Sequence, residues 1–218
     1  MMTTNKLTKT FASGSLAISI AAVAGIVNAP SAHAECRTYS FSDWITAPVL
    51  CGDKLFTYKD SSGLPDETKL PDGTDDTVEF VQVNPYEYVL NYDFVPDSFI
   101  TSFTLEYDVE IINAPGYVFD AVDLDSNVDV MPPPETLTAT FTGGTSPVTL
   151  TSTSGGSDMA YILGQPTKLT VLNSYSGAGP IDSFENSFRQ KTVPEPGTIL
   201  GLLAVGGLGL VSRFKKQK

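Results

Sequence analysis

The stretch FITSFTLEYDVEI, residues 99–111, decides the fold class of this chain. From Phe103 to Ile111 every second residue is apolar, and the residues between them are Thr, Glu or Asp. Successive side chains of a β-strand point to opposite faces, so a period of two places one face in a core and the other in water. The stretch therefore predicts a half-buried β-strand.

Similar patterns recur along the chain in shorter segments. Alternation is clear at residues 86–94 and 137–141, and residues 183–193 are expected to form a last strand followed by a short stalk. No segment outside the two chain ends has the period of a helix. Further strands are expected at residues 55–58, 78–83, 117–124, 148–152 and 169–175.

Turn-forming residues separate these segments at short intervals, as at Asn84-Pro85, Ala114-Pro115-Gly116 and Gly143-Gly144. The sequence disfavours parallel α/β architecture, because no crossover helices are available. About eight to ten short strands with such turns predict an all-β fold, an antiparallel β-sandwich or jelly roll. We expect it to form a single domain over residues 35–193.

The N-terminal 34 residues have the composition of a secretory signal peptide. Lys6 and Lys9 precede an apolar segment at 11–27, and Ala32-His33-Ala34 forms a small-residue cleavage site. The sequence predicts Sec export and cleavage by signal peptidase after Ala34. An N-terminal anchor helix is the alternative, but residues 28–31 lead directly into the cleavage motif.

The C-terminal segment, residues 194–218, has three parts. Pro194-Glu195-Pro196 is followed by an uncharged apolar run at 199–211 and then by basic residues. The run is shorter than the roughly 20 residues of a typical spanning helix. Its flanks nevertheless favour a transmembrane helix, because a basic cluster stays on the cytoplasmic side. The basic residues are Arg213, Lys215, Lys216 and Lys218.

This tail resembles the PEP-CTERM sorting signal of bacteria that make extracellular polysaccharide. The resemblance is carried by Pro194-Glu195-Pro196, the glycine-rich apolar span and Arg213-Phe214-Lys215-Lys216. It implies recognition by an exosortase, a membrane enzyme that cuts at or near the motif. We therefore expect transient anchoring in the cytoplasmic membrane, followed by transfer to the envelope surface or the extracellular space.

The predicted mature region is strongly acidic. Two of the 13 basic residues lie in the signal peptide and four in the tail, so seven remain against 24 acidic residues, a net charge of about −17. Such a charge repels phosphate backbones and anionic membranes. Nucleic-acid binding is therefore excluded.

Histidine and cysteine content restricts the chemistry further. His33 is the one histidine and leaves with the signal peptide, which excludes Ser-His-Asp and Cys-His nucleophile systems and histidine-ligated zinc or iron. Cys36 and Cys51 are the two cysteines. In an oxidising compartment they predict a disulfide. A redox pair is the alternative, but the C-x-x-C spacing is lacking.

Two acidic segments are candidates for calcium, with solvated acidic loops as the alternative. The first, at residues 123–129, has oxygen ligands at alternate positions but lacks the glycine and the bidentate glutamate of a calcium loop. The second precedes the strand at 78–83. No metal site is assigned, and the carboxylates concerned are Asp123, Asp125 and Asp129, or Asp72, Asp75 and Asp76.

These features favour a non-catalytic, exported structural or surface protein. A carbohydrate- or calcium-binding module associated with exopolysaccharide is the alternative, with Trp44 and the tyrosines as a stacking platform. Tyr86, Tyr88 and Tyr92 share one predicted strand face, which places them more simply in a core. A histidine-free glycosidase or lyase would have to use paired carboxylates.

Overall fold

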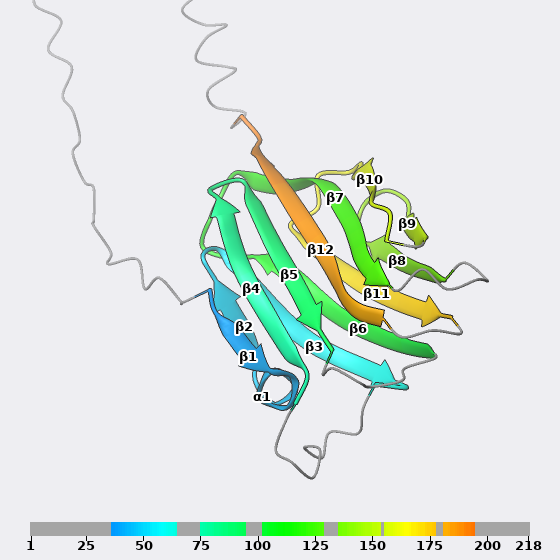
Figure 1. The fold of residues 1–218 in the computed structure, drawn as a ribbon. Coiled ribbons are helices and arrows are strands. Elements are labelled where there is room, and N and C mark those ends of the chain that lie inside the picture. Colours follow the sequence, from blue (N-terminus) through cyan, green and yellow to red (C-terminus); the bar gives the residue numbers. More distant parts are fainter. Residues whose placement is uncertain are drawn as a thin grey trace, which may run out of the picture. The chain divides into compact units, whose positions relative to one another are not determined.

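The computed structural model describes residues 36–64, 75–94, 102–128, 135–153, 155–177 and 181–194 (Figure 1). This part of the chain contains twelve strands and one short helix, and the strands form two antiparallel six-stranded sheets. The predicted β-sandwich is confirmed. The predicted signal peptide and C-terminal helix lie outside the described residues. Within those residues, no helix has the length and apolar character needed to cross a membrane.

Each sheet combines strands from distant parts of the sequence. The front sheet of Figure 1 has the order β1 (Thr38–Ser40), β4 (Thr77–Asn84), β5 (Glu87–Asp93), β12 (Ile181–Thr192), β7 (Tyr117–Val128), β10 (Asp158–Tyr161). The back sheet has the order β2 (Val49–Cys51), β3 (Lys54–Ser62), β6 (Ser102–Ile111), β11 (Lys168–Ser176), β8 (Thr136–Thr142), β9 (Val148–Thr153). The eight strands from β5 onward divide between the two sheets, in the order β5-β12-β7-β10 in the front sheet and β6-β11-β8-β9 in the back sheet. This arrangement is the jelly-roll topology.

Strand β6 confirms the prediction made from its alternation. Its apolar residues from Phe103 to Ile111 are all buried between the sheets. On the opposite face, Asp108 lies between two lysines: its carboxylate is 2.8 Å from Lys168 and 3.7 Å from Lys59. The outer face of the back sheet is therefore polar, with its carboxylates balanced by nearby cations.

Strand β5 agrees with the prediction except at its start. Tyr88 and Tyr92 are buried, but Tyr86 lies in the turn before the strand and is 51% exposed. Its ring packs beside that of Tyr117, with ring centroids 6.2 Å apart. The expectation that Tyr86 shares the core face is wrong, because the strand begins only at Glu87.

A short helix, α1 (Phe41–Thr46), was not predicted from the sequence. Ser40 begins it by accepting a hydrogen bond from the Asp43 amide at 3.1 Å, a typical N-cap. Phe41 and Trp44, three residues apart, point into the core. Trp44 is only 1% exposed, so the expectation that it offers a sugar-stacking surface is wrong. Six residues are too few for a helical period to stand out.

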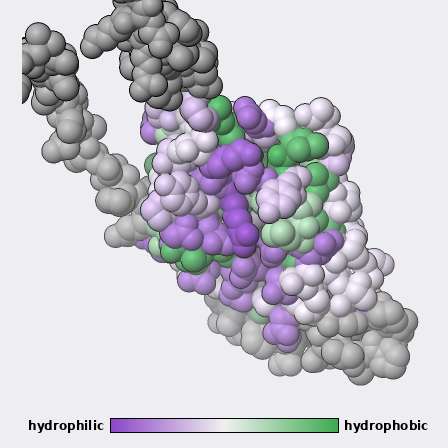
Figure 2. All heavy atoms as spheres, turned by 90° about the horizontal axis from the view of Figure 1, so that it is seen from above, coloured by the Kyte–Doolittle hydropathy of each residue, from purple (hydrophilic) through white to green (hydrophobic). Residues whose placement is uncertain are grey.

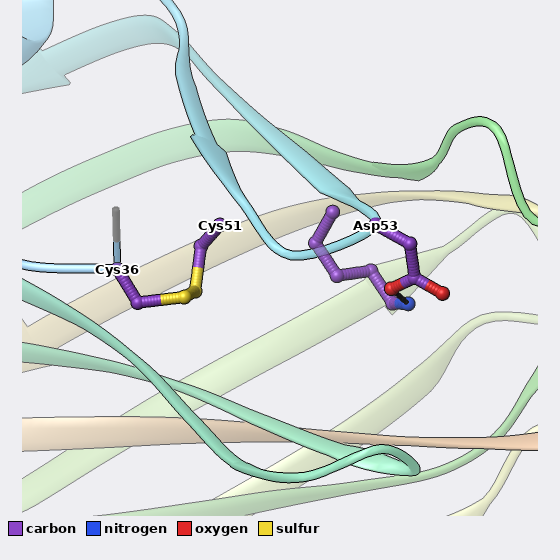
Figure 3. The surroundings of a disulfide bond; sticks show 4 residues. Cys36, Cys51 and Asp53 are labelled. Atoms are coloured by element: carbon purple, nitrogen blue, oxygen red, sulfur yellow. Dashed lines mark hydrogen bonds and ion pairs between the residues drawn. A yellow bond between two sulfur atoms is a disulfide. The ribbon is translucent and has the colours of Figure 1, made fainter. Parts of the chain in front are cut away.

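The predicted disulfide is present. Cys36 and Cys51 are bonded (Figure 3). The loop between them contains β1, α1 and β2. Cys51 is fully buried beneath this loop. The bond holds the helix and the two three-residue strands against the edge of the sandwich.

Candidate functional site

The first candidate is a group of carboxylates on the outer face of the front sheet. Strand β12 runs between β5 and β7, with Glu185 opposite Asn91 on one side and Asp125 on the other. Asp123 lies two residues from Asp125 on the same face, opposite Ser187. We call Asp123, Asp125 and Glu185 the carboxylate face.

A shallow hollow of about 130 Å³ lies on this face. Enclosed sites for small molecules usually measure about 300–1,000 Å³, so the hollow can contact part of a ligand but cannot enclose one. Amide, hydroxyl and carboxylate groups dominate its lining. The residues that form it are Asn91, Asp125, Ser126, Asn127, Ser183, Phe184 and Glu185.

The electrostatics of the carboxylate face favour a bound cation or proton. Burial raises the pKa of Glu185 above its ordinary value, the Ser187 hydroxyl opposes the rise, and the carboxylates of Asp125 and Asp123 add to it. Burial and the neighbouring Asp125 likewise raise the pKa of Asp123, and the positive charge of Arg189 opposes the rise. Among the described ion pairs, none joins these three carboxylates to a cation. On the outer face of the back sheet, by contrast, Lys59 and Lys168 form ion pairs with the carboxylates.

The structure corrects the predicted geometry of the first calcium segment. Strand β7 continues to Val128, so Asp123, Asp125 and Asn127 alternate along a strand and do not curl into a loop. A calcium loop converges its ligands by turning sharply, which a strand cannot do. Asp129 lies outside the described residues, and within them no set of three or more acidic, cysteine or histidine side chains is placed to hold a metal. Calcium binding stays a prediction.

The second acidic segment has structural partners. The Asp75 carboxylate accepts a hydrogen bond from the Ser42 amide at the start of α1, at 3.1 Å. Asp76 is buried and accepts one from the Tyr92 hydroxyl at 2.8 Å. Asp72 lies outside the described residues. The Asp75 carboxylate therefore holds the start of α1, and the Asp76 carboxylate binds Tyr92 of β5, roles that the sequence pattern did not indicate.

A buried lysine forms the second candidate. Lys54 begins β3 and is fully buried, and its Nζ donates hydrogen bonds to Asp53 Oδ1 and Gln190 Oε1. The ammonium lies 4.1 Å from the centroid of the Tyr88 ring. Gln190 Nε2 in turn donates to Asp53 Oδ2 at 3.0 Å and to the Pro85 carbonyl at 2.8 Å. Lys54, Asp53 and Gln190 thus form a closed triangle of hydrogen bonds between the two sheets.

A tight turn brings the triangle together beside the disulfide. Gly52, between Cys51 and Asp53, has a φ of +59°, and a Cβ there would lie 2.8 Å from the Tyr88 hydroxyl. Figure 3 shows Asp53 on this turn, just beyond Cys51. The sequence does not indicate a buried lysine here, because Gly52-Asp53-Lys54 has the composition of an exposed turn. Its partner Gln190 lies 136 residues away in the chain.

The predicted sorting tail leaves the sandwich from the end of β12. The Val193 amide donates to the Gly116 carbonyl at 2.6 Å, and Pro194 is exposed. Seen from this end, a hydrophilic band lies beside apolar patches (Figure 2). The remaining predicted processing residues lie outside the described residues: Ala32, Ala34, Glu195, Pro196, Arg213, Lys215 and Lys216.

Residues 192–216 match the family described as the PEP-CTERM protein-sorting motif. The chain carries a PEP-CTERM sorting motif. The motif implies export, passage through the membrane and processing by an exosortase. The match begins at the last residue of β12, so it covers the tail and not the sandwich. No curated protein matches the chain.

Several solved structures match part of this chain with low structural similarity. TmCBM61, solved in complex with β-1,4-galactotriose, is 16% identical, with a TM-score of 0.34 over 62% of this chain and 88% of its own. TmCBM27, a carbohydrate-binding module with specific mannan recognition, is 7% identical, with a TM-score of 0.36 over 72% and 96%. A cupin-2 domain from Rhodospirillum rubrum is 12% identical, with a TM-score of 0.17 over 59% and 82%. Likenesses this low carry no information about ligand or activity.

Proposed function

We propose that this protein is a non-catalytic surface protein of the cell envelope or extracellular matrix, sorted by an exosortase. The observation that carries the proposal is the PEP-CTERM motif at residues 192–216. Its partners are the Sec machinery and signal peptidase during export, the membrane through the C-terminal helix, and then the exosortase. Its role is to display the acidic sandwich outside the cell.

The end of the sandwich supports such processing. The last hydrogen bond of the C-terminal strand region is made by Val193, and the next residue, Pro194, is exposed. The Pro194-Glu195-Pro196 motif therefore begins where the described fold stops. A protease can reach a peptide segment only when it is free of stable structure. Cleavage near the motif would release the sandwich intact.

Mass spectrometry of the exported protein tests this proposal. We expect an N-terminus at Glu35 and a C-terminus near Pro194-Glu195-Pro196 in the released form. A Glu195→Ala variant should accumulate with its tail attached, in the membrane fraction. A Glu185→Ala variant, changed at an acidic residue of the sandwich, should be processed normally. Finding Lys218 on the bulk of the released wild-type protein would refute cleavage.

A second function, recognition of carbohydrate or of calcium-bridged polysaccharide, is favoured by the hollow on the carboxylate face. Its amide, hydroxyl and carboxylate groups are those that hydrogen-bond sugar hydroxyls and coordinate calcium. The test is a glycan array with and without calcium. We expect an Asp125→Asn, Glu185→Gln double variant to lose binding. A Glu110→Gln variant, on the opposite outer face, should retain it. Equal binding by the wild type, the double variant and Glu110→Gln would show that the ligand does not bind at the carboxylate face.

A further inference from the structure

The triangle of Lys54, Asp53 and Gln190 contains the three groups needed to make an amide bond. An amine acts as nucleophile, a carboxamide as electrophile, and a carboxylate that touches both can move a proton between them. Nζ of Lys54 contacts Oε1 of Gln190, the oxygen bonded directly to the electrophilic carbon Cδ. Asp53 contacts Nζ through Oδ1 and Nε2, the leaving nitrogen, through Oδ2 at 3.0 Å.

We propose that Lys54 and Gln190 react in the folded protein to form an intramolecular amide bond between the two sheets. Nζ attacks Cδ of Gln190 after giving a proton to Asp53. The Nζ–Cδ bond forms, the Cδ–Nε2 bond breaks, and Asp53 passes the proton to Nε2. Ammonia leaves and takes up the second proton lost by the lysine ammonium, so the products are the amide and one ammonium ion. No oxidant, cofactor or second enzyme is required.

The surroundings of Lys54 activate its amine. Burial lowers the pKa of Lys54 to about 8, although the Asp53 carboxylate opposes this change. A substantial fraction of the amine is then neutral near pH 8, whereas an exposed lysine is almost entirely protonated. The Lys54 side chain is fully buried with Tyr88 and Phe119 beside the ammonium, whereas the Asp53 side chain is 21% exposed. Restricted access of water to the amine favours its attack over hydrolysis of the carboxamide.

The fold holds the reacting groups in place before any bond forms. Lys54 is fixed at the start of β3 in the back sheet, and Gln190 near the end of β12 in the front sheet. The Pro85 carbonyl holds Nε2 of Gln190 at 2.8 Å and so restrains rotation of the carboxamide. Positioning of this kind lowers the entropic part of the barrier. Reaction should therefore follow folding and be absent from the unfolded chain.

Tryptic mapping of the exported wild-type protein, denatured and reduced, tests the proposal. Trypsin cannot cleave after an acylated lysine. The bond would therefore yield residues 38–59 as one peptide, with the dipeptide Gln190-Lys191 attached to Lys54. Its mass should equal that of an uncleaved 38–59 peptide plus that of free Gln190-Lys191, minus one ammonia. Normal cleavage after Lys59, an exposed lysine, is the internal control for digestion.

Variants identify the role of each group. Asp53→Asn keeps the size of the side chain but removes the proton acceptor, so its digest should contain residues 38–54 as a free peptide. Lys54→Met removes both the nucleophile and the trypsin site at position 54, so its digest should contain residues 38–59 as one peptide without the attached Gln190-Lys191 dipeptide. Circular dichroism shows whether each variant is folded, and the wild-type digest decides the question even if neither is. A free 38–54 peptide from most of the folded wild-type protein would overturn the proposal and leave only a hydrogen-bonded cluster.

Discussion

Trp44 shows how one residue can join parts of the core that lie far apart in the sequence. Its ring centroid lies 6.0 Å from that of Tyr58, 5.5 Å from Phe80 and 5.6 Å from Tyr107. These partners belong to both sheets, whereas Trp44 itself comes from α1. Edge-to-face contacts of this kind add to the free energy gained by burying the ring. The short helix therefore closes the edge of the core.

A Trp44→Ala variant should lose about 3–5 kcal/mol of unfolding free energy, because the cavity left behind cannot be filled by a rigid sandwich edge. Urea denaturation measures the change. Leu163→Ala, at a side chain that is 68% exposed, should change stability by no more than about 0.5 kcal/mol. A loss below about 1 kcal/mol for Trp44→Ala would mean that the ring packs loosely.

At the scale of elements, the sequence predicts strands where one face is buried and the strand is long. The alternation in β6 and β8 predicted both strands, because their apolar side chains point into the core and their polar side chains point towards solvent. Strands β1, β2 and β10 have three or four residues each, too few to show a period. The buried triangle could not be predicted either, since the burial of Lys54 depends on a distant strand.

The loop closed by the disulfide should depend on it for stability. A Cys36→Ser, Cys51→Ser double variant should lose about 3 kcal/mol, because cross-linking residues 15 apart restricts the unfolded chain. Thermal denaturation with and without reductant measures this, and the melting temperature of the wild type should fall on reduction. Reductant should leave the double variant unaffected. Free reaction of both cysteines with a thiol reagent in the native, unreduced protein would contradict the disulfide.

The carboxylate face should destabilise the front sheet at neutral pH. The pKa of Glu185 is raised in the folded state, so the protonated carboxyl stabilises the fold and the ionised one does not. This stabilisation is fully present at a pH below the unfolded-state pKa, near 4.3, and is lost as the pH rises through the folded-state pKa. Glu185→Gln should therefore stabilise the protein at pH 7, by about 0.5 kcal/mol, and have little effect at pH 4.

Urea denaturation at the two pH values checks this expectation. Glu110→Gln serves as the matched control, since Glu110 lies 3.9 Å from the Lys168 ammonium on the other outer face and should show no gain at pH 7. A Glu185→Gln variant that is less stable than the wild type at pH 7 would show that its bond from the Ser187 hydroxyl, 3.0 Å long, outweighs the repulsion.

The whole molecule combines a strongly acidic exported domain with a tail that carries the opposite charge. A net charge of about −17 over residues 35–193 repels itself, and salt weakens that repulsion over a Debye length of about 8 Å at physiological ionic strength. A cation that binds only the folded state stabilises it further by mass action. Specific binding and screening can therefore be separated by experiment.

We expect millimolar calcium to raise the melting temperature more than sodium chloride does at equal ionic strength. Asp75 and Asp76 already have structural partners, so Asp123 and Asp125 are the described carboxylates from which the extra shift should come. Asp125→Asn should remove part of that shift, and Glu110→Gln should not. Equal shifts of the wild-type melting temperature in the two salts would show that screening accounts for the whole effect, and would rule out a specific calcium site.

The position of β12 has a mechanical consequence. This strand is the one that continues into the tail, and it lies inside the front sheet with β5 on one side and β7 on the other. While the tail is attached, drag on the displayed domain is transmitted to the C-terminal end of β12. A load along the strand shears both hydrogen-bond ladders together, whereas a strand at a sheet edge has a single ladder to resist it. An anchored tail, as proposed above, would therefore load a strand that two neighbouring strands hold in place.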